Sequence, residues 1–450
     1  MPHSGEYLAP WERTLERILT PFEEFIHRQT TMGILLMACA VIALVIGNSP
    51  LATAYHHLME VEVGFFSGSW RIEHSVHHWI NDGLMTLFFF VVGLEIKREV
   101  LVGELSSIRQ AILPIIAAIG GMVVPALIYA ALNAGTEGAR GWGIPMATDI
   151  AFAVGVMALL GNRIPKALLT FLVALAIVDD LGAVTVIALF YTDALDFQYL
   201  GAAALIFGGL VVLNRMGVRK PLPYFLLTVL LWMAFEGSGI HATVAGIFAA
   251  WTIPARPRFG THAFLDRMQS LLDQFAREDR AGEPLVRNAP QTATLWKISQ
   301  TVSLSVSPLQ RLESNLHLPV TYLVIPLFAL ANAAIMLTSE SMAQAAAGSV
   351  APGILLGLVA GKLLGVAGSV WLALRLGVGQ LPERVTQSHM IGAGLLAGIG
   401  FTMSIFIADL AFYGNGPLIN AAKMGILASS LLGGVAGYAW LRWMVPAAKF

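Results

Sequence analysis

The sequence predicts an all-α integral membrane protein with about twelve transmembrane helices. Of its 450 residues, 56% are hydrophobic and 12% are charged, whereas about 25% of the residues of a soluble protein are charged. The charged residues gather in short stretches, and many apolar runs between them approach the roughly 20 residues that a helix needs to cross a bilayer. A net charge of −1 gives no reason to expect nucleic acid, so the first partner that the composition implies is the lipid bilayer.

Hydropathy and helix-breaking residues define the individual spans. The stretch before the first apolar run holds five glutamates and three arginines, which is too polar for a signal peptide, so we expect that run to be a retained helix. We place spans near residues 32–48, 78–96, 110–133, 142–160, 166–190, 199–213, 221–236, 239–254, 319–337, 351–374, 387–410 and 417–441.

Positive charges orient these spans, because loops rich in Lys and Arg stay in the cytoplasm. Leaving out the N-terminal arm and the 255–318 loop, one set of loops holds twelve such residues and the opposite set holds three. Twelve spans put both termini on one side, and this asymmetry predicts that the side is cytoplasmic. The larger set is Lys97, Arg98, Arg109, Arg163, Lys166, Arg215, Arg219, Lys220, Arg375, Arg384, Arg442 and Lys449, and the smaller is Arg71, Arg140 and Lys423.

The chain therefore divides into five regions with distinct patterns. We expect a cytoplasmic arm over 1–31, eight helices over 32–254, a long cytoplasmic loop over 255–318, four helices over 319–441 and a cytoplasmic tail over 442–450. The segment 49–77 should lie outside the membrane. Within it, VEVGFFSGSWRIEH (61–74) has a Gly-containing centre between apolar–polar alternations, which is typical of a β-hairpin.

Four charged residues stand where the bilayer should be. Asp179 and Asp180 lie in the middle of FLVALAIVDDLGAVTVIALFY, Asp149 lies in GIPMATDIAFAVGV, and Lys362 lies in GILLGLVAGKLLGVAG. A charge at the bilayer centre costs at least about 2.5–3.5 kcal/mol, so each position is a candidate functional site. The competing interpretation is a satisfied salt bridge that only fixes helix packing. It suits Asp149 or Lys362 alone better than it suits two consecutive aspartates.

The geometry of a helix gives the two aspartates different roles. Adjacent helical residues point about 100° apart, so one carboxyl can pair with Lys362 while the other faces a cavity. A carboxylate in an apolar medium is comfortable only with a proton or a hard cation, which predicts proton/cation exchange. Sodium prefers oxygen ligands, as other hard cations do, and Thr148 with nearby backbone carbonyls supplies candidates.

Two spans, one in each half of the chain, carry residues that interrupt helices. Asp149 follows Pro145 and Thr148, and the span near 387–410 contains GAGLLAGIGF. Paired interruptions favour broken helices at a transport site, a rule drawn partly from ion-transporter structures. An acid near two helix N-termini and a base near two C-termini would offset the charges of the helix ends. Close packing of small residues is the competing interpretation of the glycines.

Four long motifs resemble the NhaA family of sodium/proton antiporters. They are WINDGLMTLFFFVVGLEIKRE (79–99), ATDIAFAVGVMALLGNRIP (147–165), FLVALAIVDDLGAVTVIALFYT (171–192) and GIGFTMSIFIADLAF (398–412). The similarity extends from about residue 30 to 441. It implies a fold of twelve helices in inverted repeats, with two unwound helices that cross beside the ion site.

The resemblance also implies roles for individual residues. Asp180 would bind the cation, Asp179 would exchange protons and pair with Lys362, and Asp149 and Thr148 would sit at the first crossing. Asp82 matches an acid at the outer end of the second helix. The resemblance further assigns unwound segments to Met146, Ala147, Gly398, Ile399 and Gly400, and a response to pH to Glu95, Arg98, Glu99, His241, Glu313 and His317.

The resulting hypothesis is an electrogenic Na+(Li+)/H+ antiporter of the bacterial inner membrane, regulated by pH. It would export Na+, its transported metal, without a cofactor, and would form a homodimer through the 61–74 hairpin. The alternatives are exchange of another cation such as K+, an intramembrane aspartyl protease, and a sensor or scaffold with a relic transporter core. The long 255–318 loop exceeds the family's usual connection, and Asp409 has no assigned role.

Minor features point to no other chemistry. His74, His77 and His78 have a helical spacing that suits metal ligands, but we expect a solvated outer loop there. The single Cys39 excludes an internal disulfide.

Overall fold

The structure, a computed structural model, describes residues 29–67, 70–192, 195–279 and 284–445. These residues are helical apart from one two-stranded sheet, which confirms the all-α class. The expected N-terminal arm, up to residue 28, and most of the expected tail, from residue 446, lie outside the described residues. The described residues form two compact units. The first comprises those up to Met85, those of 104–192 and those from Thr321 onward, and the second comprises those of 86–103 and of 195–320.

Among the described residues, seven helical segments are long and apolar enough to cross a membrane, and three bent helix pairs raise the number to ten at most. Two further expected spans fall on α5 (Met85–Val102), which carries four charges at its end, and on α11 (Val244–Thr252), which has nine residues. The seven are α6 (Ile108–Asn133), α8 (Lys166–Phe190), α9 (Phe197–Arg215), α10 (Pro221–Ser238), Pro308–Asn332, Val350–Arg375 and Gly416–Met444.

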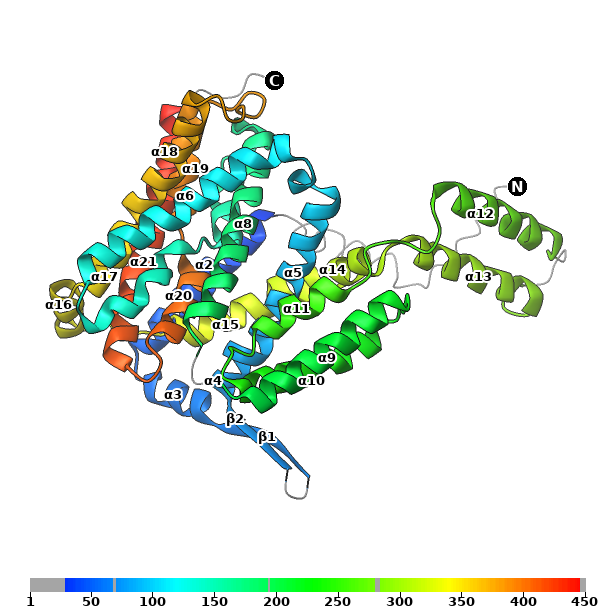
Figure 1. Ribbon diagram of the computed structural model, residues 1–450, viewed down its shortest axis with the longest axis horizontal. Coiled ribbons are helices and arrows are strands. Elements are labelled where there is room, and N and C mark those ends of the chain that lie inside the picture. The colour runs from blue at the N-terminus through cyan, green and yellow to red at the C-terminus, as the bar shows by residue number, and fades with distance from the viewer. Residues whose placement is uncertain (1–28, 68–69, 193–194, 280–283, 446–450) are drawn as a thin grey trace. The chain divides into compact units, whose positions relative to one another are not determined.

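The first unit is a bundle of closely packed helices (Figure 1). Glycines permit this packing, since a Cβ added to Gly120 of α6 would collide with the Gly365 carbonyl of α18. The other elements of this unit are α2 (Gln29–Gly47), α3 (Ala52–Glu60), α4 (Val76–His78), η1 (Trp79–Leu84), η2 (Glu104–Ser106), η3 (Glu137–Met146), α7 (Ile150–Ala158), η4 (Gly161–Arg163), α15 (Ile325–Asn332), α16 (Ser339–Ala347), α17 (Val350–Leu356), η6 (Gly357–Gly361), α18 (Lys362–Arg375), α19 (Gln387–Ala397), α20 (Phe401–Ala411), α21 (Gly416–Ala439) and η7 (Trp440–Met444).

The predicted hairpin between the first two spans is present. Strand β1 (Glu62–Ser67) pairs antiparallel with β2 (Trp70–Ser75), with Glu62 opposite Ser75 (Figure 1). Ser75 then caps the next helix by accepting the His78 N–H at 3.1 Å. Since His74 lies in β2, the three nearby histidines do not share one helical face, and the premise of a helical metal site there is wrong.

The second unit holds α9 and α10 with α5, α11 and the residues of the long loop. Pro221 starts α10, where its missing N–H costs nothing, and Gly239, at φ +83°, ends it. The expected 255–318 loop forms a hairpin of α12 (Thr261–Arg277) and α13 (Ala289–Ser305), followed by α14 (Pro308–Pro319). The next element, η5 (Val320–Val324), lies beyond this loop, and all of its residues but the first belong to the first unit.

Candidate functional site

Two helix pairs in the first unit are interrupted where the sequence predicted breaks. The chain leaves η3 at Met146 and re-enters a helix at Ile150, with a bend of 45°, and it leaves α19 at Ala397 and re-enters at Phe401, with a bend of 46°. Ala147 lies in the first link, which runs over 147–149, and Gly398, Ile399 and Gly400 lie in the second. Met146 is the last residue of η3.

The two links are bonded to each other. The Asp149 N–H donates to the Ile399 carbonyl at 2.7 Å. The Thr148 hydroxyl lies 2.9 Å from the Ala397 carbonyl, and the Ser404 hydroxyl donates to the Ile144 carbonyl at 2.9 Å. Backbone groups that a continuous helix would have paired are thus satisfied across the crossing, as a non-aqueous setting requires.

Asp149 serves the N-termini of both half-helices that leave the crossing. Its Oδ1 accepts the Phe152 N–H of α7 at 2.9 Å, and its Oδ2 accepts the Thr402 N–H of α20 at 3.1 Å. The Thr402 hydroxyl donates to the same Oδ2. A carboxylate suits this position because helix N-termini carry partial positive charge. The arrangement is the one that the sequence predicted for an acid near two N-termini.

Helix α8 brings the aspartate pair to the crossing. Asp179 and Asp180 are 0% and 1% exposed, near the middle of a helix of 25 residues. Adjacent residues point about 100° apart, so the two carboxyls leave the helix in different directions. Their depth means that any change in their charge must be compensated locally.

Asp179 is bound to two side chains from other elements. Its Oδ2 forms an ion pair with Lys362 Nζ and accepts the Thr148 hydroxyl at 2.7 Å. Its Oδ1 accepts no hydrogen bond from any residue that the structure describes, although it is buried. Lys362 is itself 0% exposed and directly follows a π-helical turn, η6. Such turns often occur at functional sites.

This geometry fits a group that exchanges ligands. The Thr148 hydroxyl oxygen lies within hydrogen-bond distance of both the Asp179 carboxylate and the Ala397 carbonyl, so three oxygens gather there. Asp180 is the next residue along α8. Protons and hard cations bind to oxygen atoms. The site therefore offers a proton acceptor and several candidate ligands for a small cation, which would be cargo.

A second polar cluster lies in the second unit. Arg98 forms ion pairs with Glu99 (2.8 Å) and Glu313 (3.1 Å), while His317 Nδ1 lies 3.7 Å from Glu95. His241 stands apart from them. It precedes the N-terminus of α11, whereas Lys97 donates to the Trp251 carbonyl at the opposite end of that helix, at 2.6 Å.

Sequence reasoning missed Thr402 and Ser404, the two hydroxyls that complete the crossing. A usable signal existed, because both follow the glycine-rich break within four residues. Hydroxyl side chains there are placed to bond the backbone groups that an unwound helix leaves unpaired. The π-helical turn before Lys362 had no comparable signal.

A membrane bundle with two broken helices crossing at buried carboxyls defines a secondary ion transporter. The chain belongs to the Na+/H+ antiporter 1 family, whose sequence pattern matches residues 23–441.

Three curated relatives agree with this assignment, and each carries the name Na(+)/H(+) antiporter NhaA or NhaA 1. The chain is 52% identical to the protein of Saccharophagus degradans, over 98% of this chain and 95% of that one. It is 50% identical to the protein of Sulfurimonas denitrificans, over 98% and 99%, and to that of Acidithiobacillus ferrooxidans, over 94% and 97%. Because the match to the Sulfurimonas protein covers nearly all of both chains, the two are similar in length.

Proposed function

We propose that this chain exchanges Na+ for H+ at the crossing of its broken helices, with Asp180 as the cation ligand. Asp179 holds and releases the proton, and Lys362 balances its charge. The observation that carries this proposal is the pair of adjacent buried carboxyls, of which Asp179 is bound to Lys362 and Thr148. Family membership supports the same exchange.

The contacts of Asp179 suggest how cation and proton compete. While Lys362 holds Oδ2, the ion pair is neutral as a whole. When Asp179 carries its proton, this ion pair is absent and Lys362 keeps its positive charge. A cation that approaches Asp180 then adds a second positive charge, and the repulsion favours loss of the Asp179 proton, which restores the neutral Asp179–Lys362 pair. When protons return, the site loses its attraction for the cation. Exchange then follows from charge balance, without a cofactor.

The proposal also covers the membrane orientation, the movement of net charge and the choice of cation. The distribution of positive residues supports a bacterial inner-membrane protein with both termini in the cytoplasm. A carboxyl pair that takes up more than one proton per cation moves net charge, so we include electrogenic transport. Li+ shares the preference of Na+ for oxygen ligands and is included as cargo.

An aspartyl protease fits these contacts poorly. Such an enzyme needs two aspartyl groups that share a proton around a water molecule. Asp149, the natural second member, accepts N–H or O–H donors on both of its oxygens, so both oxygens are engaged at the starts of the two half-helices. The geometry therefore favours transport over peptide hydrolysis.

The test is proton flux in inverted membrane vesicles after Na+, Li+ or K+ is added to a preformed pH gradient. Na+ and Li+ should collapse the gradient for the natural chain and not for Asp180→Asn. Asp196→Asn is the matched control, because Asp196 is the N-cap of α9, and Asn caps equally well. Activity of Asp180→Asn equal to that of the control would end the assignment, and a response to K+ alone would make the chain a potassium exchanger.

A further inference from the structure

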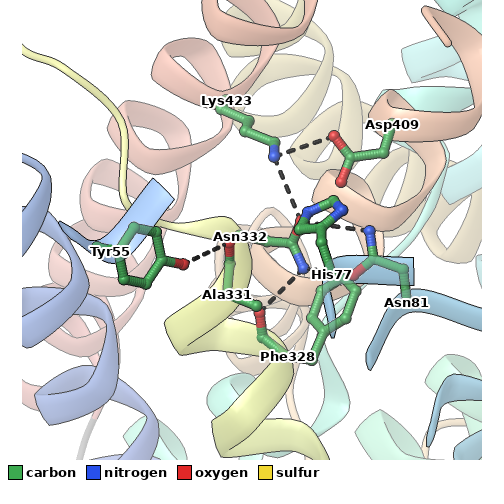
Figure 2. Close-up of polar contacts among 8 residues, drawn as sticks. All are labelled: Tyr55, His77, Asn81, Phe328, Ala331, Asn332, Asp409 and Lys423. Atoms are coloured by element: carbon green, nitrogen blue, oxygen red, sulfur yellow. Dashed lines mark hydrogen bonds and ion pairs between the residues drawn. The ribbon is translucent and has the colours of Figure 1, made fainter. Parts of the chain in front are cut away.

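Asn332 is the centre of a second group of polar side chains in the first unit (Figure 2). Its Oδ1 lies 3.2 Å from His77 Nε2 and 3.4 Å from Lys423 Nζ, and its Nδ2 donates to Asn81 Oδ1 at 2.7 Å. Lys423 also forms an ion pair with Asp409, at 3.0 Å. We call these five residues the Asn332 cluster.

The cluster joins five helical elements from three separate parts of the chain. Asn332 ends α15, Asp409 lies in the last turn of α20, Lys423 belongs to α21, and His77 and Asn81 belong to α4 and η1. It lies at the end of the bundle near the β1–β2 hairpin, because His77 follows β2 directly. Tyr55 adds a tie to α3 by donating to the Ala331 carbonyl at 2.8 Å (Figure 2).

The ion pair in this cluster is not arranged for maximal stability. Lys423 is 7% exposed, and Asp409 Oδ2 is buried without a hydrogen-bond partner among the described residues. Burying two charges costs desolvation that such a pair recovers only with full hydrogen bonding. Apolar residues could fill the same space at little cost. A function other than stabilisation therefore explains the pair better.

Helix α20 connects the cluster to the ion site. It carries Thr402, which binds Asp149, near its start, and Asp409 seven residues later on the same face. The separation along the helix is about 10 Å. The contacts of Thr402 and Asp409 thus hold the two ends of α20. Its beginning is further held to α21 by the Phe401 N–H, which donates to the Ser430 hydroxyl at 3.2 Å.

We infer that the Asp409–Lys423 pair is a latch that holds α20 against α21 and closes the route from the ion site to the hairpin face. The inference rests on the proposed function. In the structure both transport carboxyls are buried, so release on that face requires helix ends to part. Separating α20 from α21 breaks the ion pair and exposes both charges to water, where each is well solvated. Asp409 and Lys423 are positioning residues, since neither contacts the ion site.

The decisive variant removes the latch without leaving an orphan charge. Asp409→Leu with Lys423→Met should fold, whereas either change alone should lower the melting temperature by leaving one charge buried and unpaired. Lys423→Arg keeps the pair and should behave like the natural chain.

The measurement is the half-saturating Na+ concentration on each membrane face, in right-side-out and in inverted vesicles. Loss of the latch favours the state open to the hairpin face. The half-saturating concentration should therefore fall about threefold on that face and rise about threefold on the other. A purely structural role would lower the rate on both faces without opposite shifts. Unchanged concentrations, or shifts in one direction on both faces, would overturn the inference.

A second readout needs no transport. In detergent, backbone hydrogen exchange in the last turns of α20 should be faster in the double variant than in the natural chain, and normal in Lys423→Arg. Equal exchange in all three would refute the latch. If the natural chain showed no Na+-dependent flux, the proposed function would fail, while the exchange result would still decide whether Asp409 and Lys423 restrain α20.

Discussion

Thr402, at the start of α20, donates both its backbone N–H and its hydroxyl to one oxygen of Asp149, which lies in the link before α7. The other oxygen of Asp149 caps α7. One buried carboxylate therefore fixes the starting points of two half-helices that lie about 250 residues apart in the chain. The ion site depends on this joint, because Thr148, the neighbour of Asp149, is one of the two residues bound to Asp179.

Asp149→Ala should destabilise the protein more than loss of an ordinary helix cap does. An ordinary cap contributes about 1 kcal/mol, whereas a buried carboxylate with several donors should contribute about 2–4 kcal/mol, since each hydrogen bond to a charged group is worth roughly 1.5–3 kcal/mol. Thermal unfolding in detergent measures the difference. Asp196→Ala, at the N-cap of α9, is the control. Equal melting temperatures for the two variants would show that Asp149 is a routine cap.

The sequence predicted the crossing well because charge and backbone chemistry are local properties. Pro145 and the glycines of 398–400 cannot continue a helix easily. A carboxyl such as that of Asp179 costs free energy in a bilayer, so its presence there indicates a function. Which residues complete the crossing depends on contacts between segments far apart in the chain. Thr402 and Ser404 look ordinary until the two breaks are brought together.

The number of spans depends on more than local hydropathy. Hydropathy assigned twelve spans, but α5 ends in four charges and α11 has nine residues, so neither is long and apolar enough on its own. Within the long 255–318 loop, no helix bounds were predicted. Its helices depend on pairings such as that of Thr294 with Glu278, which no local pattern announces.

Lys362→Met should destabilise the chain strongly. It removes the partner of a fully buried carboxylate, and breaking a buried pair costs about 3–5 kcal/mol. Adding Asp179→Leu should restore most of the melting temperature without restoring proton flux, because the proton carrier is then absent. Lys362→Arg keeps the charge and serves as the control. Full flux in the double variant would contradict the assignment of Asp179 to the proton.

Glu313→Gln should shift the dependence of transport on pH without abolishing transport. The change breaks the ion pair with Arg98 and alters the charge near His317 and Glu95, while the ion site in the first unit keeps all its ligands. The measurement is flux in inverted vesicles across roughly pH 5–8, the range over which a histidine ordinarily changes its charge. Asp266→Asn, an exposed acid in α12, is the control. A profile equal to that of the control would remove Glu313 from regulation.

Removing the β1–β2 hairpin should convert the proposed dimer into a monomer that still transports. An isolated two-stranded sheet is marginally stable, and the outer edges of its strands have unpaired backbone groups. This favours pairing with the strands of a second copy of the chain. Replacing residues 63–73 by a short Gly–Ser link leaves every residue of the ion site in place. Light scattering in detergent gives the mass, and vesicle flux gives the activity. A dimer that persists without the hairpin would place the interface elsewhere.

The α12–α13 hairpin should loosen in acid because of Glu278. Hydrogen bonds from Thr294 (2.7 Å) and Gln274 (2.8 Å) favour the charged form and lower the pKa of Glu278 below its ordinary value of 4.5. A carboxyl with a lowered folded-state pKa stabilises the fold above its ordinary pKa, and this contribution is lost as pH falls through the lowered value. Hydrogen exchange in α13, corrected for the intrinsic rate, should therefore report easier opening at pH 3 than at pH 6. Thr294→Val removes the first of the two donors and should shrink this pH dependence. Asp266→Asn should leave it intact, and a pH dependence unchanged by Thr294→Val would show that Glu278 does not hold the hairpin closed.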